Sequence, residues 1–325
     1  MTGGHENPTG PFPYYSGGSY MRYIIKRLFI SVLTVFIITT VTFFLMHLIP
    51  GNPFLGDKTL PPNIMHNLEV KYGLNQPLIS QYGTYLNDLL HGDFGVSIKQ
   101  QGRAVTDIIT SSFPVSARLG LVAVAFALIV GTILGILSAL KNGKGLDHTV
   151  MILATLGTSI PSFVIATVSM ILFGVLLQWL PTYGLDDPSA YILPAFALSF
   201  FPLSFIARLM RSSMLDVINQ DYIKTARAKG LKESKVILKH AMKNAIQPVV
   251  TYLGTLMAGV LTGSFVIEKV FTIPGLGKFF VDSITNRDYP VILGTTIFYA
   301  MFLIIMYLLV DVIYMIIDPR IKLNS

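Results

Sequence analysis

The side chains that could carry covalent or metal chemistry are few in this chain. Cysteine is absent, which excludes disulfides, thiolate metal sites, iron–sulfur clusters and thiol nucleophiles together. The six histidines are scattered without the spacing of metal ligands: His5, His47, His66, His91, His148 and His240. We therefore predict neither a metal site nor a catalytic residue.

One stretch partly matches the sequence pattern of a phosphate-binding loop. Residues Gly51–Thr59 read Gly-Asn-Pro-Phe-Leu-Gly-Asp-Lys-Thr. A P-loop needs Gly, four residues and then Gly-Lys followed by Ser or Thr. Asp57 occupies the position of the required lysine. The chain also has neither the Gly-x-Ser-x-Gly nor the His-Glu-x-x-His pattern of hydrolases. We expect no ATP hydrolysis and no bound cofactor in this chain.

The composition indicates which elements must position the remaining functional residues. Apolar residues make up 52% of the chain and charged residues 13%, whereas about 25% charged residues is usual in soluble proteins. So few charges could not cover so many apolar side chains in water, which favours a bilayer as the solvent. The net charge of +7 could suggest nucleic acid, but its distribution along the chain fits a membrane face better. We expect no nucleic-acid partner.

Six charge-free windows are long enough to cross a bilayer. A helix rises about 1.5 Å per residue, so about 20 apolar residues span the hydrocarbon core. We therefore predict an all-α polytopic membrane protein with six transmembrane helices. The third window contains Pro161 and is expected to be kinked or tilted. The six windows are Leu28–Ile49, Leu119–Leu140, Thr149–Leu180, Ser189–Ala207, Asn244–Ile267 and Tyr289–Val310.

Single residues inside these windows have two interpretations each. The pairs Gly131/Gly135 and Gly259/Gly263 have the four-residue spacing that lets helices approach closely, but glycine is common in membrane helices anyway. Asp311 lies near the end of the sixth window. An acid in a membrane helix is either functional or satisfied by the bundle or a partner subunit, and the second interpretation is the simpler one.

The basic residues predict the orientation. With the N-terminus inside, sixteen of the 24 lysines and arginines fall in cytoplasmic segments, as the positive-inside rule requires. We predict a plasma-membrane protein in contact with lipid, with both termini cytoplasmic. Residues 1–20 are rich in Gly, Pro, Ser and Tyr and lack an apolar signal region, so we expect a disordered leader or an added extension. The transmembrane domain is then 21–325.

The cytoplasmic segment 212–243 contains the most informative local pattern. Asp221 suits a helix N-terminus, Lys229 suits a C-terminus, and Gly230 suits the left-handed position after a helix. A second helical stretch is expected from about Glu233 to Ala245. Ala226 and Ala228 would keep the first helix thin enough for a partner groove. Alternatively, the segment is a basic hairpin lying on anionic lipid.

A resemblance decides between these two. The sequence Tyr222-Ile-Lys-Thr-Ala-Arg-Ala-Lys-Gly-Leu231 resembles the coupling-helix motif, or EAA loop, of ABC importer permeases. Of the ideal letters, only Ala226 and Gly230 are matched, which is typical of the peptide-importer branch. Further stretches, in order along the chain, resemble the B-type permease of oligopeptide importers, closest to those of Gram-positive bacteria: 49–53, 71–77, 92–97, 159–163, 261–270, 273–277, 283–288, 311–314 and 317–321.

The resemblance implies a type I ABC importer permease fold and an ATP-driven oligopeptide importer. It implies a homologous C-type permease, two ABC ATPase subunits that bind ATP and Mg, and an extracellular peptide-binding protein. An extracellular cap is expected over 51–112. The residues implied to contact an ATPase are Asp221, Tyr222, Lys224, Thr225, Ala226, Arg227, Ala228, Lys229 and Gly230. The extracellular gate loop is Ile273, Pro274, Gly275, Leu276 and Gly277. No substrate-binding residue is identified.

Three alternatives stay open at this point. Permeases of dipeptide and nickel importers share the same pattern of loops. An ion-coupled secondary transporter would carry buried charges at mid-membrane, and only Asp311 points that way. A membrane scaffold without transport activity is the third. The sequence does not give the preferred peptide length, the identity of the binding protein, or whether the peptides serve nutrition or signalling.

Overall fold

The computed structural model describes residues 17–48, 66–67, 69–70, 73–100, 102–261 and 265–317. This part of the chain is helical, and its one β-bridge joins Val96 to Ala104. The first helix, α1, begins at Gly17, so residues 17–20 of the expected leader or extension are helical. The near-P-loop Gly51–Thr59 and the C-terminal residues 318–325 lie outside the described chain, as does the side chain of Asp311.

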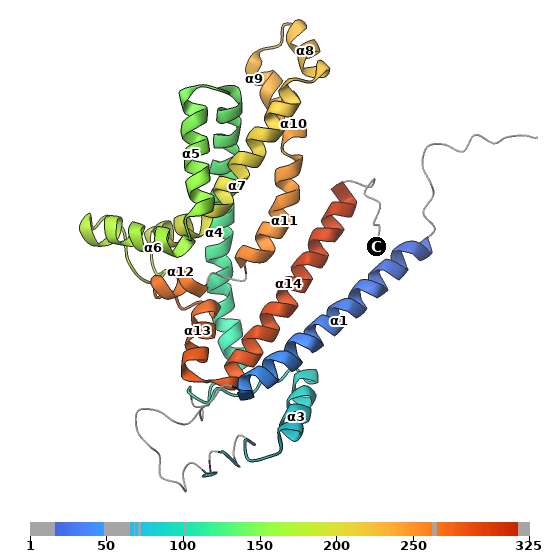
Figure 1. Cartoon of the computed structure of the whole chain (residues 1–325), viewed down its shortest axis with the longest axis vertical. Coiled ribbons are helices and arrows are strands. Elements are labelled where there is room, and N and C mark those ends of the chain that lie inside the picture. Colours follow the sequence, from blue (N-terminus) through green and yellow to red (C-terminus); the bar gives the residue numbers. More distant parts are fainter. Residues whose placement is uncertain are drawn as a thin grey trace, which may run out of the picture.

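Among the described residues, four helices are each long and apolar enough to cross a membrane. The helices α4 and α7 pack side by side through the middle of the molecule, while α14 and α1 run obliquely beside them (Figure 1). Their bounds are α1 Gly17–Leu48, α4 Val105–Leu140, α7 Ile192–Ile218 and α14 Tyr289–Ile317. The second predicted span therefore begins earlier than expected, because α4 continues outward through Pro114 to Val105.

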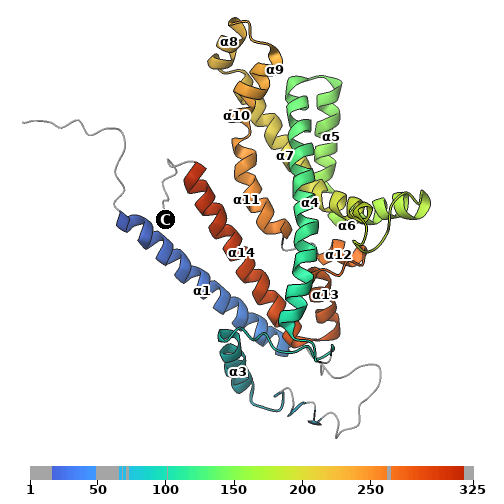
Figure 2. The same ribbon diagram turned by 180° about the vertical axis from the view of Figure 1, so that it is seen from behind.

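The third span is broken. Helix α5 (Gly145–Ser159) and the stretch formed by α6 (Ser162–Ser169) and a π-helical turn (Met170–Leu176) meet at 106°, so the kink predicted at Pro161 is a full break between two helices. The break follows from Pro161, because the residue before a proline is pushed out of the helical region. Ile160 indeed has φ −88° and ψ 124°. As a result, α6 projects sideways from the bundle (Figures 1 and 2).

The fifth span is bent less. The stretch α9 (Glu233–Lys235), a π-helical turn (Val236–Ala241) and α10 (Met242–Ala245) leads into α11 (Gln247–Leu261) at 51°. Counted with each bent pair as one span, the described chain has the six predicted spans. The predicted fifth window extended to Ile267, but that residue lies in a separate short helix, α12 (Phe265–Val270).

Glycines bring α4 and α7 into close contact. An added Cβ at Gly135 would lie 2.6 Å from the Ala207 carbonyl, and one at Gly131 would lie 2.8 Å from the Leu203 carbonyl. The backbones therefore approach as the Gly131/Gly135 spacing predicts. The second pair does not behave this way: an added Cβ at Gly259 would have no atom within 4 Å, and Gly263 lies outside the described residues.

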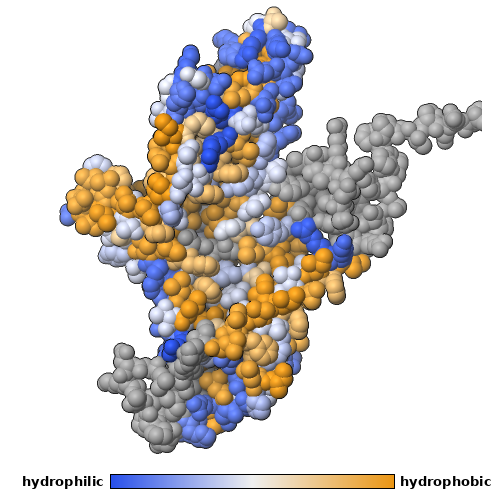
Figure 3. Space-filling view, viewed as in Figure 1, coloured by the Kyte–Doolittle hydropathy of each residue, from blue (hydrophilic) through white to orange (hydrophobic). Residues whose placement is uncertain are grey.

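Polar surface gathers at the two ends of the bundle (Figure 3). We call them the α8 end, which carries α8 (Asp221–Ala228) and the α4–α5 turn, and the α13 end, which carries α13 (Leu276–Asn286) and α3 (Leu78–Leu90). The expected cap is helical at α3, where Tyr82 Oη lies 2.6 Å from Thr40 Oγ1 of α1. Residues 105–112, the last part of the predicted cap, form the first turns of α4.

Candidate coupling and gating sites

Helix α8 at the α8 end begins at the predicted residue and ends one residue before the predicted Lys229. It begins at Asp221, after Gln220 in an extended conformation, and ends at Ala228. Gly230 has φ +74°. Its N–H donates to the Arg227 carbonyl at 2.9 Å, and the Leu231 N–H donates to the Ala226 carbonyl at 3.4 Å. This pair of bonds is the Schellman helix end, which needs a left-handed residue, and it confirms the predicted role of Gly230 in the fold.

One face of α8 is not available to a partner. Ile223 and Ala226 are buried against a cluster that includes Val236 and Ala241. The expectation that Ala226 lies open to a partner groove is therefore wrong, because the helix is amphipathic and turns this residue inward. The remaining predicted coupling residues are exposed: Asp221, Tyr222, Lys224, Thr225, Arg227, Ala228, Lys229 and Gly230.

Polar contacts tie α8 to the stretch that follows it. The Arg227 guanidinium donates to Glu233 at 3.2 and 2.7 Å, and the Asn244 side-chain amide donates to Tyr222 Oη at 2.8 Å. The hydrogen bond from Arg227 to the Glu233 carboxylate raises the pKa of Arg227, so its charge is retained. Together with the buried face, these contacts make α8, α9 and α10 one unit at the entrance of the fifth span.

The predicted gate loop lies at the opposite end, between α12 and α13. Ile273, Gly275, Leu276 and Gly277 are buried, and Pro274 is exposed. Ile273 packs in a cluster with Leu119 of α4, and Leu276 packs in another that contains residues of α4 and α14. Most of the loop therefore contacts its own chain, and Pro274 is the residue that it presents outward.

A buried acid lies under this loop. Glu268 of α12 is fully buried, and its Oε2 accepts from the Lys278 N–H at 3.2 Å. The Gly277 N–H and Ser116 of α4 hydrogen-bond to the same carboxyl, and Ser116 Oγ accepts from the Leu276 N–H at 2.9 Å. Gly275 at the N-cap of α13 has no side chain, so Glu268 supplies the oxygen that an N-cap residue usually provides.

Glu268 is a fully buried acid near the polar α13 end of the bundle. Burial raises the pKa of Glu268, while the hydrogen bonds from Ser116, Lys278 and Gly277 act in the opposite direction. Its second oxygen, Oε1, is buried without a hydrogen-bond partner among the described residues, and so is the hydroxyl of Tyr299 on α14.

A second buried acid joins the cap to the bundle. Asp288, between α13 and α14, accepts from Ser97 Oγ at 2.5 Å, from the Ile98 N–H at 3.0 Å and from the Lys99 N–H at 3.3 Å. Sequence reasoning assigned no role to Ser116, Glu268 or Asp288. The available signal was that both acids occur inside motifs that carried the family resemblance, at 261–270 and 283–288.

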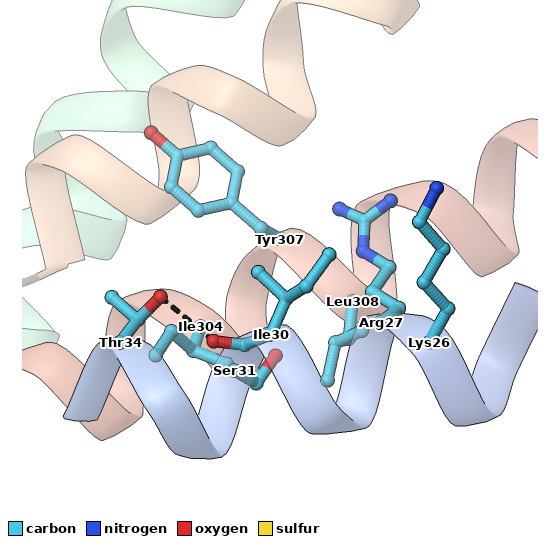
Figure 4. A pocket seen from close by; sticks show the side chains of 8 residues that line it. All are labelled: Lys26, Arg27, Ile30, Ser31, Thr34, Ile304, Tyr307 and Leu308. Atoms are coloured by element: carbon cyan, nitrogen blue, oxygen red, sulfur yellow. Dashed lines mark hydrogen bonds between the residues drawn. The ribbon is translucent and has the colours of Figure 1, made fainter. Parts of the chain in front are cut away.

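Two cavities lined by described residues lie in different parts of the bundle. One of 420 Å³ lies between α1 and α14, where Lys26 and Arg27 project from α1 toward α14 and Tyr307 points away from α1 (Figure 4). Another, of 540 Å³, is lined mainly by aromatic and aliphatic side chains, including Phe126 and Trp179. Within the described residues, no group of three or more His, Cys, Asp or Glu side chains could hold a metal ion.

Comparison with known proteins identifies the family. Residues 131–323 match the model of the binding-protein-dependent transport system inner membrane component, and residues 20–120 match the model of the N-terminal part of such membrane components. The chain is 50% identical to the dipeptide transport system permease protein DppB of Bacillus subtilis (strain 168) over 304 residues, covering 94% of this chain and 99% of that protein. The chain belongs to this family of transport-system membrane components.

Other members also resemble the chain over their whole length. The oligopeptide transport system permease protein OppB of Escherichia coli (strain K12) is 45% identical, covering 93% of this chain and 99% of that one. In structure, the chain resembles the MetNI methionine ABC transporter in an inward-facing conformation, with a TM-score of 0.52 and 17% identity over 65% of this chain and 96% of that chain. This likeness supports the predicted type I importer permease fold of a multi-pass family member.

Proposed function

We propose that this chain is the B-type permease subunit of an ATP-driven importer of oligopeptides. The observation that carries the proposal is helix α8, which is packed on its own chain by one face and exposed on the other, in a family whose members include peptide permeases. The chain supplies half of the pathway, and ATP and Mg bind in separate ATPase subunits. A dipeptide substrate is the alternative, since relatives of both descriptions cover nearly the whole chain.

The coupling mechanism follows from the contacts of α8. Its exposed residues dock in a groove on an ATPase subunit, and the ion pair between Arg227 and Glu233 passes the movement of α8 to α9 and α10. Because that stretch leads directly into α11, closure of two ATPase subunits on ATP would rotate the fifth span. The cavity would then alternate between inward and outward access, as a rigid-body switch does.

The orientation assigns the α8 end to the cytoplasm and the α13 end to the outside. Basic residues concentrate between Arg208 and Lys243, and the positive-inside rule puts such a segment in the cytoplasm. Both termini are then cytoplasmic. The outside carries the cap, the gate loop Ile273–Gly277 and the docking face for a peptide-binding protein, with Pro274 as its exposed point. A homologous C-type permease completes the pathway.

Growth of a peptide-requiring auxotroph tests the substrate. A strain lacking its own peptide importers receives this chain with its partner subunits, and the required amino acid is supplied in dipeptides or in longer peptides. Growth on longer peptides that Gly230→Val abolishes supports the proposal. Growth confined to dipeptides transfers the proposal to the dipeptide branch. No growth in a correctly assembled complex contradicts peptide import and leaves nickel to be tested.

Co-purification tests the subunit class. An importer subunit is recovered with a homologous permease and two P-loop ATPases, whereas an ion-coupled transporter or a scaffold is recovered without them. Recovery of the chain alone, under mild detergent and with all partners expressed, would contradict the assembly that we propose.

A further inference from the structure

Three helices meet at the carboxyl group of Glu268. The carboxyl belongs to α12, Ser116 reaches it from α4, and the N–H groups of Gly277 and Lys278 reach it from α13. Because Ser116 Oγ also accepts from the Leu276 N–H at 2.9 Å, the serine joins the carboxyl, α4 and the gate loop in one network. The loop is thus fastened to α4 through side chains and not only by apolar packing.

The loop backbone lies directly on this carboxyl group. An added Cβ at Gly277 would lie 2.9 Å from Glu268 Oε2, and one at Gly275 would lie 2.5 Å from Ser116 Oγ and overlap the carboxylate as well. Neither position accepts a side chain without movement of Glu268 or Ser116. Glycine is needed at both positions for this close approach of backbone to carboxylate.

The network is not fully satisfied. Glu268 Oε1 and Tyr299 Oη are both buried, and neither has a hydrogen-bond partner in the described part of the chain. Buried polar atoms without partners are rare in native proteins and cost free energy. The junction is therefore less stable than a fully hydrogen-bonded one of the same geometry.

We propose that Glu268 is a positioning residue of the transport cycle: with Ser116 it latches the gate loop Ile273–Gly277 to α4, and the latch releases each time the outer side opens. This inference rests on the proposed transport function and on the gate role of the loop. All groups of the latch lie in this one chain. Its release therefore requires α12 and α13 to move away from Ser116 of α4.

Cysteine labelling measures the latch in the assembled complex. The chain has no cysteine of its own, so Leu276→Cys places a single thiol at a fully buried position of the loop. In proteoliposomes without ATP, a membrane-impermeant maleimide reaches it only when the loop is released. Asn286→Cys, at the exposed end of α13, reports the labelling rate of an open site and serves as the control.

Removing the carboxyl should release the loop. We expect Glu268→Ala to raise the labelling rate of the thiol at position 276 about tenfold or more, the scale expected when a partner of buried hydrogen-bonding groups is removed. Glu268→Gln should raise it less, because an amide oxygen still accepts one N–H. Ser116→Ala removes only Oγ and should also raise it, so it tests the latch even if Glu268→Ala fails to assemble.

Transport measurements separate a latch from a merely structural residue. The Glu268→Ala complex should keep its ATPase partners and basal ATP hydrolysis and import less peptide for each ATP hydrolysed. Unchanged labelling at position 276 in assembled Glu268→Ala and Ser116→Ala complexes would overturn the latch. If the wild-type complex imports no peptide but the variants still accelerate labelling, the substrate assignment fails and the latch stands.

Discussion

Arg211 of α7 donates two hydrogen bonds to the carboxylate of Asp147 in α5, from Nε at 2.6 Å and from Nη2 at 2.8 Å. The carboxylate also accepts from Ser138 Oγ at 2.5 Å and from the Gly143 N–H at 2.9 Å. The ion pair thus clamps the α4–α5 turn to the part of α7 that leads into α8. A force applied at α8 would reach both helices through this clamp.

Asp147→Ala should destabilise the α8 end. The carboxylate is buried, but the Arg211 side chain is 24% exposed, so the loss should be smaller than the about 3 to 5 kcal/mol of a fully buried ion pair. We expect lower yield of assembled complex and a lower unfolding temperature, with Asp147→Asn intermediate because it keeps one acceptor. Asp216→Asn, an exposed acid on the same helix α7 as Arg211, is the control and should behave as wild type. Equal unfolding temperatures for Asp147→Ala and the control would contradict a structural clamp.

The effect of a substitution at Gly230 should depend on the strain of its left-handed backbone and not on clashes with neighbouring atoms. An added Cβ would have no atom within 4 Å, but φ is +74°, a conformation that costs an ordinary L-residue about 1 to 2 kcal/mol. We expect Gly230→Asn to retain most transport, Gly230→Ala to lose part of it, and Gly230→Val to uncouple ATP hydrolysis from transport. The measurement is peptide uptake per ATP hydrolysed in proteoliposomes.

Gly83→Ala is the matched control for this series. Gly83 also has no atom within 4 Å of an added Cβ, and its φ is not positive, so alanine in helix α3 should be harmless or slightly stabilising. If Gly230→Val kept the wild-type peptide uptake per ATP hydrolysed, the proposed lever role of this turn would be contradicted. A loss in Gly83→Ala as large as in Gly230→Ala would mean that the assay responds to any glycine substitution.

Local rules allowed the sequence to predict α8 and a close helix contact at Gly131 and Gly135, but not that α7 is the partner helix. The end of α8 depends on the left-handed preference of Gly230 alone, and the close approach at Gly135 depends on a spacing within one helix. The direction of the break at Pro161 could not be predicted, because proline only ends the helix and tertiary packing decides where α6 goes. The burial of Ala226 could not be predicted either, because it depends on packing against Val236 and Ala241 of the next helical stretch.

The buried acids were missed because their partners are distant in sequence. The oxygens of Asp288 bond to residues about 190 positions earlier, and the Leu276 N–H bonds to Ser116 across 160 positions. No periodicity or spacing rule links residues so far apart. Apolar windows also end where charges begin, so Glu268 and Asp288 appeared as boundaries of spans and not as members of buried networks.

Asp288→Ala should loosen the cap without disturbing the α8 end. The carboxylate holds Ser97 and the N–H groups of Ile98 and Lys99 at the start of α14. Without it, we expect trypsin added from outside to cleave at Lys99 or Arg103 several times faster in proteoliposomes. Asp107→Asn, an exposed acid on α4, is the control. Equal cleavage rates in the two variants would contradict the tie between cap and bundle.

Enlarging Gly135 should separate α4 from α7. A Cβ there would lie 2.6 Å from both the Ala207 carbonyl and Met210 Cβ, so Gly135→Val must displace one helix, and such overpacking costs about 1 to 3 kcal/mol. The matched substitution Gly259→Val has open space around its added Cβ and should be tolerated. Thermal unfolding of the purified complex measures both. Gly135 and Gly259 belong to two separate pairs with the same four-residue spacing. A lower unfolding temperature in Gly135→Val alone would therefore show that contact with the facing helix, and not the spacing, decides the cost.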